Sequence, residues 1–145
     1  MMTMKPTIFL RIASALTLVH AILHTIGGVF GKPGPGAAAV AFAAMQSNQF
    51  LVMGLTRTYA DFYRGMGLAG TISMTAESIV FWQLGSLAKT HALRLRPILA
   101  TFAIAYMALA VNSSFYFFLG PVITEILIAL CLGLAIATAK QPQVA

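Results

Sequence analysis

The residues of this chain best suited to chemistry are two histidines and three acids set among apolar residues. His20 and His24 are four residues apart, which places both imidazoles on one face of a helix. Apolar surroundings disfavour the charged forms of carboxyl and imidazole groups, so both approach neutrality and can exchange protons with a bound molecule. The candidate catalytic residues are therefore His24, Glu125, His20, Glu77 and Asp61.

The same residue types also suit a metal ion, because two histidines and a carboxylate can bind zinc, copper or non-haem iron. However, no glutamate follows His20 as it does in the zinc-protease helix motif. Two histidines on one helix face also cannot bind opposite faces of one haem. The pattern favours acid–base chemistry, so we assign no metal ligand and leave the cofactor unknown.

Residues 57–67 read Arg-Thr-Tyr-Ala-Asp-Phe-Tyr-Arg-Gly-Met-Gly and lead into a long apolar segment. A cluster this polar beside a membrane span is costly unless its side chains are paired, bind something or react. We expect Asp61 to cap the helix that starts here and to pair with Arg57 or Arg64. Predicted ligand-binding residues from this stretch and from the third apolar segment are Arg64, Tyr63, Asn112 and Tyr116.

The composition defines the class of protein that must position these residues. Of 145 residues, 59% are hydrophobic and 8% are charged, and the mean hydropathy is +0.88. Soluble domains are about 25% charged, so this composition predicts an integral membrane protein. The net charge of +6 is scattered along the chain, which favours contact with lipid headgroups over nucleic-acid binding. A single cysteine, Cys131, rules out an intrachain disulfide.

Four apolar segments reach the length of about 20 residues that a spanning helix needs. They are residues 7–30, 62–87, 97–118 and 121–139. A further segment, 37–55, carries adjacent polar residues (Gln46, Ser47, Asn48 and Gln49) that would be costly at the bilayer centre. The sequence therefore predicts one all-α membrane domain over residues 1–145, a four-helix bundle with 37–55 as an interfacial or re-entrant helix.

Basic residues predict the orientation of this bundle. Six lie on the side of the termini and three on the other, which places both termini in the cytoplasm. The six are Lys5, Arg11, Lys89, Arg94, Arg96 and Lys140. At about 1.5 Å of rise per residue, His20 and Glu77 lie near the midplane, and His24, Asn112 and Glu125 in the outer half. We expect these five to converge, with His24 and Glu125 as a proton-sharing pair.

Each predicted span also carries a stripe of small and polar residues at helical spacing. Small residues let helices approach closely in lipid, so we expect the stripes to face inward. They are Ser14, Thr17, His20, His24 and Gly27; Gly67, Gly70, Ser73 and Glu77; Thr101, Ala105, Ala108 and Asn112; and Glu125, Ala129, Gly133 and Ala137.

The stretch at residues 57–67 resembles the Arg-(Ser/Thr)-Tyr-x-Asp-Phe-Tyr-x-Gly-x-Gly pattern of a group of small bacterial four-span membrane proteins of unknown function. That group also has a histidine in its first span. Ala60 and Met66 stand here where aromatic residues are expected. The resemblance implies a bacterial inner-membrane protein in which Asp61 matters, and it implies no reaction.

The leading functional hypothesis is binding of a lipophilic small molecule in an outer-half polar pocket, with isomerase, cyclase or hydrolase chemistry as an extension. A structural or accessory subunit is the alternative from a different class, and proton-coupled transport by an oligomer is the third. A binding protein predicts an internal cavity, whereas a structural subunit predicts direct side-chain pairs. The expected partners are membrane lipid, a lipophilic small molecule and a second copy of the chain, with no nucleic acid.

Overall fold

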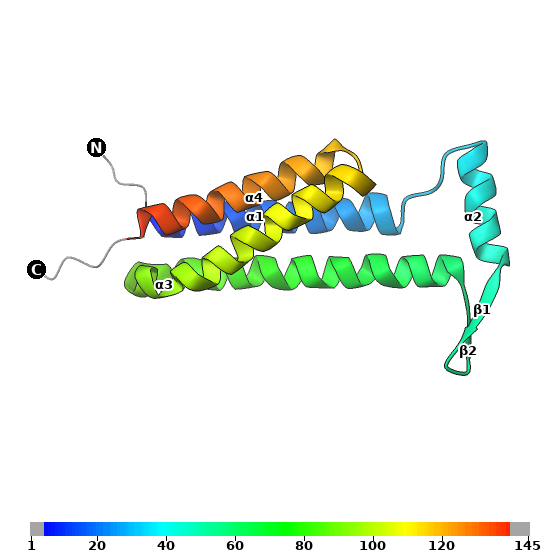
Figure 1. Cartoon of the computed structure of the whole chain (residues 1–145), viewed down its shortest axis with the longest axis horizontal. Helices are drawn as coiled ribbons and strands as arrows, with labels where there is room; N and C mark the ends of the chain where they lie inside the picture. Colours follow the sequence, from blue (N-terminus) through cyan, green and yellow to red (C-terminus); the bar gives the residue numbers. More distant parts are fainter. Residues whose placement is uncertain (1–4, 140–145) are drawn as a thin grey trace, which may run out of the picture. The chain divides into compact units, whose positions relative to one another are not determined.

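A computed structural model describes residues 5–139 of the chain, most of which are helical. In order, the elements are α1 (Pro6–Leu23), the π-helical turn η1 (His24–Val29), α2 (Ala37–Ser47), β1 (Gln49–Val52), β2 (Leu55–Thr58), α3 (Tyr59–Tyr116) and α4 (Leu119–Thr138) (Figure 1). The prediction of an all-α fold is confirmed, apart from one short β-hairpin. Among the described residues, three helices are long and apolar enough to cross a membrane: α1 together with η1, α3 and α4.

Helix α3 is bent sharply at His91, where φ is −128° and ψ is 30°. The bend separates an arm over residues 59–90 from an arm over 92–116, and the chain doubles back there (Figure 1). The sequence predicted a gap from 88 to 96 between two spans, but the helix is interrupted at one residue only. Pro97 consequently lies inside the second arm and does not begin it.

The described residues form two compact units, each with its own set of internal contacts. The bundle unit combines Met1–His20 with Met74–Ala145, of which residues 5–20 and 74–139 are described, and the hairpin unit is Ala21–Ser73. The unit boundaries fall inside α1 and inside α3, and the single membrane domain over residues 1–145 stays a prediction. Lys140, one of the six basic residues on the predicted side of the termini, lies outside the described residues.

The bundle unit has an apolar core drawn from α1, both arms of α3 and α4. Its largest fully buried side chains include Leu10, Phe81, Leu99, Ile128 and Leu132. Because lipid tails are as apolar as these side chains, the core is stabilised mainly by close packing. Large apolar side chains also cover the outer faces of the helices, as the 71% exposure of Ile104 illustrates. Such faces suit a lipid environment.

The second arm of α3 presents a different face to the core than the sequence predicted. Its expected inward stripe (Thr101, Ala105, Ala108 and Asn112) is exposed. Leu99, Tyr106, Ala110 and Ser113 are buried instead. Gly133 and Ala137 of the predicted α4 stripe are exposed as well, while Glu125 and Ala129 are buried. The core face of these helices thus combines large side chains such as Leu99 and Tyr106 with other small residues than the predicted ones, such as Ala110 and Ser113.

In the hairpin unit, α2 ends within the polar residues Gln46 to Gln49. The sequence predicted that these residues lie inside a longer helix. Helix α2 has 11 residues, fewer than the roughly 20 that a spanning helix needs. After Ser47 the chain forms strands β1 and β2, which pair antiparallel with Gln49 opposite Thr58 and Val52 opposite Leu55. The expectation of a helix over 37–55 is therefore correct only as far as Ser47.

A two-residue turn, Met53-Gly54, joins the strands with φ values of 48° and 79°. Both residues are left-handed, as the tight turns that match strand twist require. Methionine rarely adopts this conformation, so the turn left no clear signal in the sequence. Phe50 packs against Tyr59 and Phe62, with ring centroids 5.0 and 5.7 Å apart, and this contact anchors the hairpin to the start of α3.

Candidate functional site

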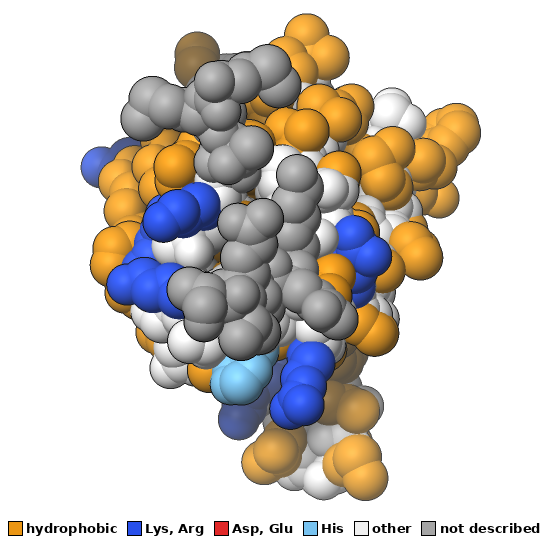
Figure 2. All heavy atoms as spheres, turned by 90° about the vertical axis from the view of Figure 1, so that its left-hand side faces the viewer, with side chains coloured by type: hydrophobic (Ala, Val, Ile, Leu, Met, Phe, Trp, Pro, Cys, Tyr) orange, Lys and Arg blue, Asp and Glu red, His pale blue; other side chains and the backbone are white. Residues whose placement is uncertain are grey.

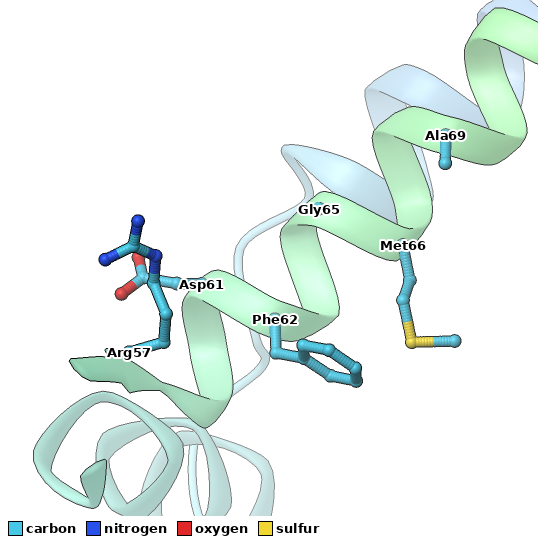
Figure 3. A pocket seen from close by; sticks show the side chains of 6 residues that line it. All are labelled: Arg57, Asp61, Phe62, Gly65, Met66 and Ala69. Carbon is cyan, nitrogen blue, oxygen red and sulfur yellow. The ribbon is translucent and has the colours of Figure 1, made fainter. Parts of the chain in front are cut away.

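A hollow of about 360 Å³ lies along the start of α3 within the hairpin unit (Figure 3). Its lining consists of Arg57 from β2 and of Asp61, Phe62, Gly65, Met66 and Ala69 from α3. Helical spacing brings these α3 residues to adjoining faces, because positions three and four apart are neighbours. The hollow thus combines two charged side chains with an apolar wall.

Asp61 is fixed in place by a reciprocal cap at the start of α3. The Asp61 N–H donates to the Thr58 hydroxyl oxygen at 3.0 Å. In return, Asp61 Oδ2 accepts from the Thr58 hydroxyl at 2.8 Å and from the Thr58 N–H at 3.2 Å. This arrangement is a capping box, in which Thr58 is the N-cap and Asp61 reaches back from the third helical position. The predicted capping role of Asp61 is therefore correct, although Thr58 shares it.

The charges around Asp61 remain exposed. The positive charges of Arg64 and Arg57 both favour the Asp61 carboxylate, although its hydrogen bonds with Thr58 contribute more. The Arg57 guanidinium donates its hydrogen bond to the Thr56 carbonyl oxygen at 2.8 Å. Figure 3 shows the polar ends of Arg57 and Asp61 on one side of the helix, with Phe62 and Met66 directed elsewhere. Both charged groups can therefore receive the polar end of a ligand.

His24 lies at the start of η1 and is half-buried. Its Nε2 atom donates to the Gly67 carbonyl oxygen at 3.0 Å, so Nε2 carries a proton. A Cβ atom on Gly70 would lie 3.4 Å from this nitrogen, and one on Gly67 would lie 2.9 Å from a methyl carbon of Val29. The two glycines therefore allow η1 to approach α3 inside this unit.

Thr25, the residue after His24 in η1, extends the contact between η1 and α3. The Thr25 hydroxyl lies 2.9 Å from the Thr71 hydroxyl, and the Phe30 N–H donates to the Thr25 carbonyl oxygen five residues back. Single π-helical turns occur frequently at functional sites. Here the wide turn brings His24 and Thr25 together onto α3.

In the bundle unit, Glu77 takes part in a buried polar contact near the middle of three helical segments. The Tyr106 hydroxyl donates to Glu77 Oε2 at 2.5 Å and lies 3.5 Å from the Thr17 hydroxyl. This contact joins α1 to both arms of α3. His20, also in this unit, is half-buried.

Glu125 on α4 is only 6% exposed. Its Oε1 atom accepts from the Ser113 hydroxyl at 3.0 Å, and its Oε2 atom is buried with no hydrogen-bond partner in the described part of the chain. Asn112 and Tyr116 lie near Ser113 in the sequence but are exposed. Because His24 belongs to the hairpin unit and Glu125 to the bundle unit, their proposed pairing stays a prediction.

Polar residues outside the candidate site hold the bundle unit together, among them Ser14, which the sequence predicted to face inward. The hydroxyls of Ser14 and Ser78 each donate to the other residue's carbonyl oxygen, at 2.8 and 2.9 Å. Arg11 Nη2 donates to the Ser86 hydroxyl at 2.9 Å, and the guanidinium lies 3.3 Å from the centroid of the Trp82 ring. Tyr106 did leave a signal, since a tyrosine inside an apolar segment usually requires a hydroxyl partner.

No group of three or more histidine, cysteine, aspartate or glutamate residues lies close enough to hold a metal ion within residues 5–139. The histidines and acids that the sequence singled out are instead divided between two structural units. Asp61 and His24 belong to the hairpin unit, and His20, Glu77 and Glu125 belong to the bundle unit.

The fold and the hollow define a mostly helical protein with three candidate membrane-spanning helices among its described residues. No protein-family model, no curated protein and no solved structure matches the chain. The resemblance to small bacterial four-span proteins therefore stays a prediction, and the functional argument rests on the residues themselves.

Proposed function

We propose that this protein is a small integral membrane protein that binds a lipophilic molecule at the hollow beside the start of α3. The polar end of the molecule contacts Arg57 and Asp61, and its apolar part lies along Phe62, Met66 and Ala69. The observation that carries the proposal is an exposed guanidinium and an exposed carboxylate beside an apolar wall.

The proposal includes four membrane crossings. Each arm of α3, residues 59–90 and 92–116, exceeds the length of about 20 residues that a crossing needs, and α1 with η1 and α4 supply the other two. The bend at His91 then lies at a membrane surface, on the same side as both ends of the chain.

Basic side chains support a cytoplasmic location for the termini in a bacterial inner membrane. Lys and Arg side chains gather on the face at the bent end of α3, and no acidic side chain is visible on that face (Figure 2). Basic residues concentrate on the cytoplasmic side of membrane proteins. A reporter fused at Ala145 should be active in its cytoplasmic form only, and periplasmic activity would contradict this orientation.

Binding has better support than catalysis. Asp61 is the one acid–base group in the lining of the hollow, and its Oδ2 atom is engaged by Thr58. Glu77 and Glu125 both accept hydrogen bonds from hydroxyl groups of the bundle unit. Proton transfer to a bound molecule would therefore depend on Asp61, and this catalytic extension is subsidiary to the binding proposal.

Photolabelling tests the proposal. The full-length protein in phosphatidylcholine nanodiscs is irradiated with a fatty acid or a fatty amine that carries a diazirine in its chain, and the labelled peptides are identified by mass spectrometry. Label should concentrate on residues 57–69 and should fall when Gly65→Leu fills the hollow. Gly133→Leu is the matched control, because a Cβ atom meets nothing within 4 Å at either glycine.

A structural or accessory subunit remains the alternative, and a specific observation favours it. Three polar pairs join helical segments directly: Ser14 with Ser78, Tyr106 with Glu77, and Ser113 with Glu125. Such pairs are expected of a protein whose polar residues only set helix packing. Labelling spread evenly over the apolar helices, and insensitive to Gly65→Leu, would support this alternative and contradict the binding proposal.

A further inference from the structure

Arg11 carries a positive charge that no acid of the bundle unit neutralises. One nitrogen of its guanidinium, Nη2, donates to Ser86, and the group lies flat against Trp82. The other, Nη1, is buried and has no hydrogen-bond partner within the described residues. The two acids of this unit, Glu77 and Glu125, are bonded to Tyr106 and Ser113. A partly buried guanidinium without a counter-charge is costly, which points to an anion supplied from outside the chain.

The surroundings of Arg11 are basic. Lys5 is exposed just before the start of α1, and Lys89 and Arg94 are exposed on either side of the bend in α3 at His91. Arg96 has a separate role, because its guanidinium donates to the carbonyl oxygens of Ile136 and Ala139 and so caps the end of α4. This end of the unit therefore combines free positive charges with one incompletely bonded guanidinium.

We propose that this end of the bundle unit binds the phosphate of an anionic phospholipid, with Arg11 as its anchor. The planar guanidinium fork matches phosphate oxygens, and the Arg11 side chain as a whole is only partly buried. Lys89 lies about one helical turn after Ser86, on the side of α3 that Arg11 contacts, and adds a second positive charge. Trp82 is 56% exposed and suits the headgroup level of a membrane.

Trp82 also provides the assay, because it is the single tryptophan of the chain. The full-length protein is placed in phosphatidylcholine vesicles, and its fluorescence is quenched by increasing fractions of acyl-brominated phosphatidylglycerol or acyl-brominated phosphatidylcholine. A basic side chain near an anionic surface gives about a fivefold preference, so phosphatidylglycerol should quench at about one fifth of the mole fraction or less. Arg11→Gln should bring the ratio of the two midpoints close to one.

The controls separate lipid binding from a purely structural role. Arg11→Gln should leave quenching by brominated phosphatidylcholine unchanged, and Arg11→Lys should keep part of the preference. Lys32→Gln removes the same charge from an exposed position of the hairpin unit and should behave as the unaltered protein. If Arg11→Gln fails to fold, the double substitution Lys89→Gln and Arg94→Gln at exposed positions should lower the preference.

Three outcomes would overturn the proposal. The first is equal quenching of the unaltered protein by the two lipids. The second is an undiminished phosphatidylglycerol preference in Arg11→Gln or, where that variant does not fold, in the double variant. The third is an equal loss in Lys32→Gln, which would show a general effect of net charge and no site at Arg11.

Discussion

The two units use polar residues in opposite ways. In the bundle unit, Ser14, Ser78 and Glu125 are buried and bond to other helices of the same unit. In the hairpin unit, Arg57 and Asp61 are exposed beside a hollow. The same residue types therefore fix packing in one region and remain accessible in the other. The difference lies in exposure, because Asp61 stays open to a ligand although it bonds to Thr58.

The proposed membrane topology gives a physical reason for this difference. Water is absent from the hydrocarbon core, so a donor or acceptor there would need a partner within the protein. Near the membrane surface water can solvate a charge, so an exposed carboxylate costs little there. Among the predicted catalytic residues, Glu77 and Glu125 therefore bond to hydroxyl groups of neighbouring helical segments, whereas Asp61 is exposed to a ligand.

The largest expected effect comes from breaking a pair in the bundle unit. Tyr106→Phe leaves the partly buried Glu77 carboxyl without its hydroxyl donor and should lower the free energy of unfolding by about 1–2 kcal/mol. The double substitution Tyr106→Phe with Glu77→Leu removes both partners and should recover most of that loss. Titration with sodium dodecyl sulfate measures both. If the double variant were less stable than Tyr106→Phe alone, Glu77 would have a role beyond its contact with Tyr106.

The cap of α3 should give a smaller effect. Thr58→Ala removes the N-cap hydroxyl and should cost about 1 kcal/mol in the same titration. Asp61→Asn keeps an oxygen that can accept from Thr58 and should cost less, while it removes the negative charge at the hollow. Labelling by the fatty amine that falls in Asp61→Asn but not in Thr58→Ala would separate ligand binding from capping. Equal losses in both variants would leave Asp61 with a capping role alone.

Sequence reasoning succeeded where the physical signal is local or long. The apolar segments predicted the long helices, and Asp61 at a helix start predicted a cap. It missed the β-hairpin, because Phe50, Leu51 and Val52 form an apolar run too short to distinguish a strand from a helix. It also chose the wrong face for the second arm of α3, where Tyr106 is buried and the small residues are exposed.

The division of the site residues could not be predicted for a related reason. Depth along a span places His24 and Glu125 in one layer, but depth does not specify which helices a residue meets. Within its own unit, His24 bonds to Gly67, and Glu125 bonds to Ser113. The hydrogen-bond partners of such residues depend on how each helix is rotated about its own axis. The small-residue stripes indicated that rotation correctly only for part of α1 and part of α4.

His24 should contribute less to stability than Tyr106, although both make hydrogen bonds. His24→Phe loses the bond to the Gly67 carbonyl oxygen, but that oxygen also accepts from the Thr71 hydroxyl at 3.2 Å. Because no acceptor is left without a partner, the expected loss is about 0.5–1 kcal/mol. A loss above that of Tyr106→Phe in the same titration would show that the imidazole has further partners and would strengthen the predicted pairing with Glu125.

The smallest expected effect on stability is the most informative about the hollow. Gly65 on α3 and Gly133 on α4 are both exposed helical glycines, and a Cβ atom at either meets nothing within 4 Å. Leucine at each position should therefore raise stability slightly, by up to about 1 kcal/mol, through its higher helix propensity. Thermal unfolding of the two variants in the same detergent measures this gain and should show similar shifts.

The variants should differ only in photolabelling at residues 57–69, because the leucine at position 65 occupies the hollow and the one at position 133 does not line it. If both variants retain the label, the exposed charges of the hairpin unit have no ligand at the hollow, and the contrast between the two units would then reflect solvation alone.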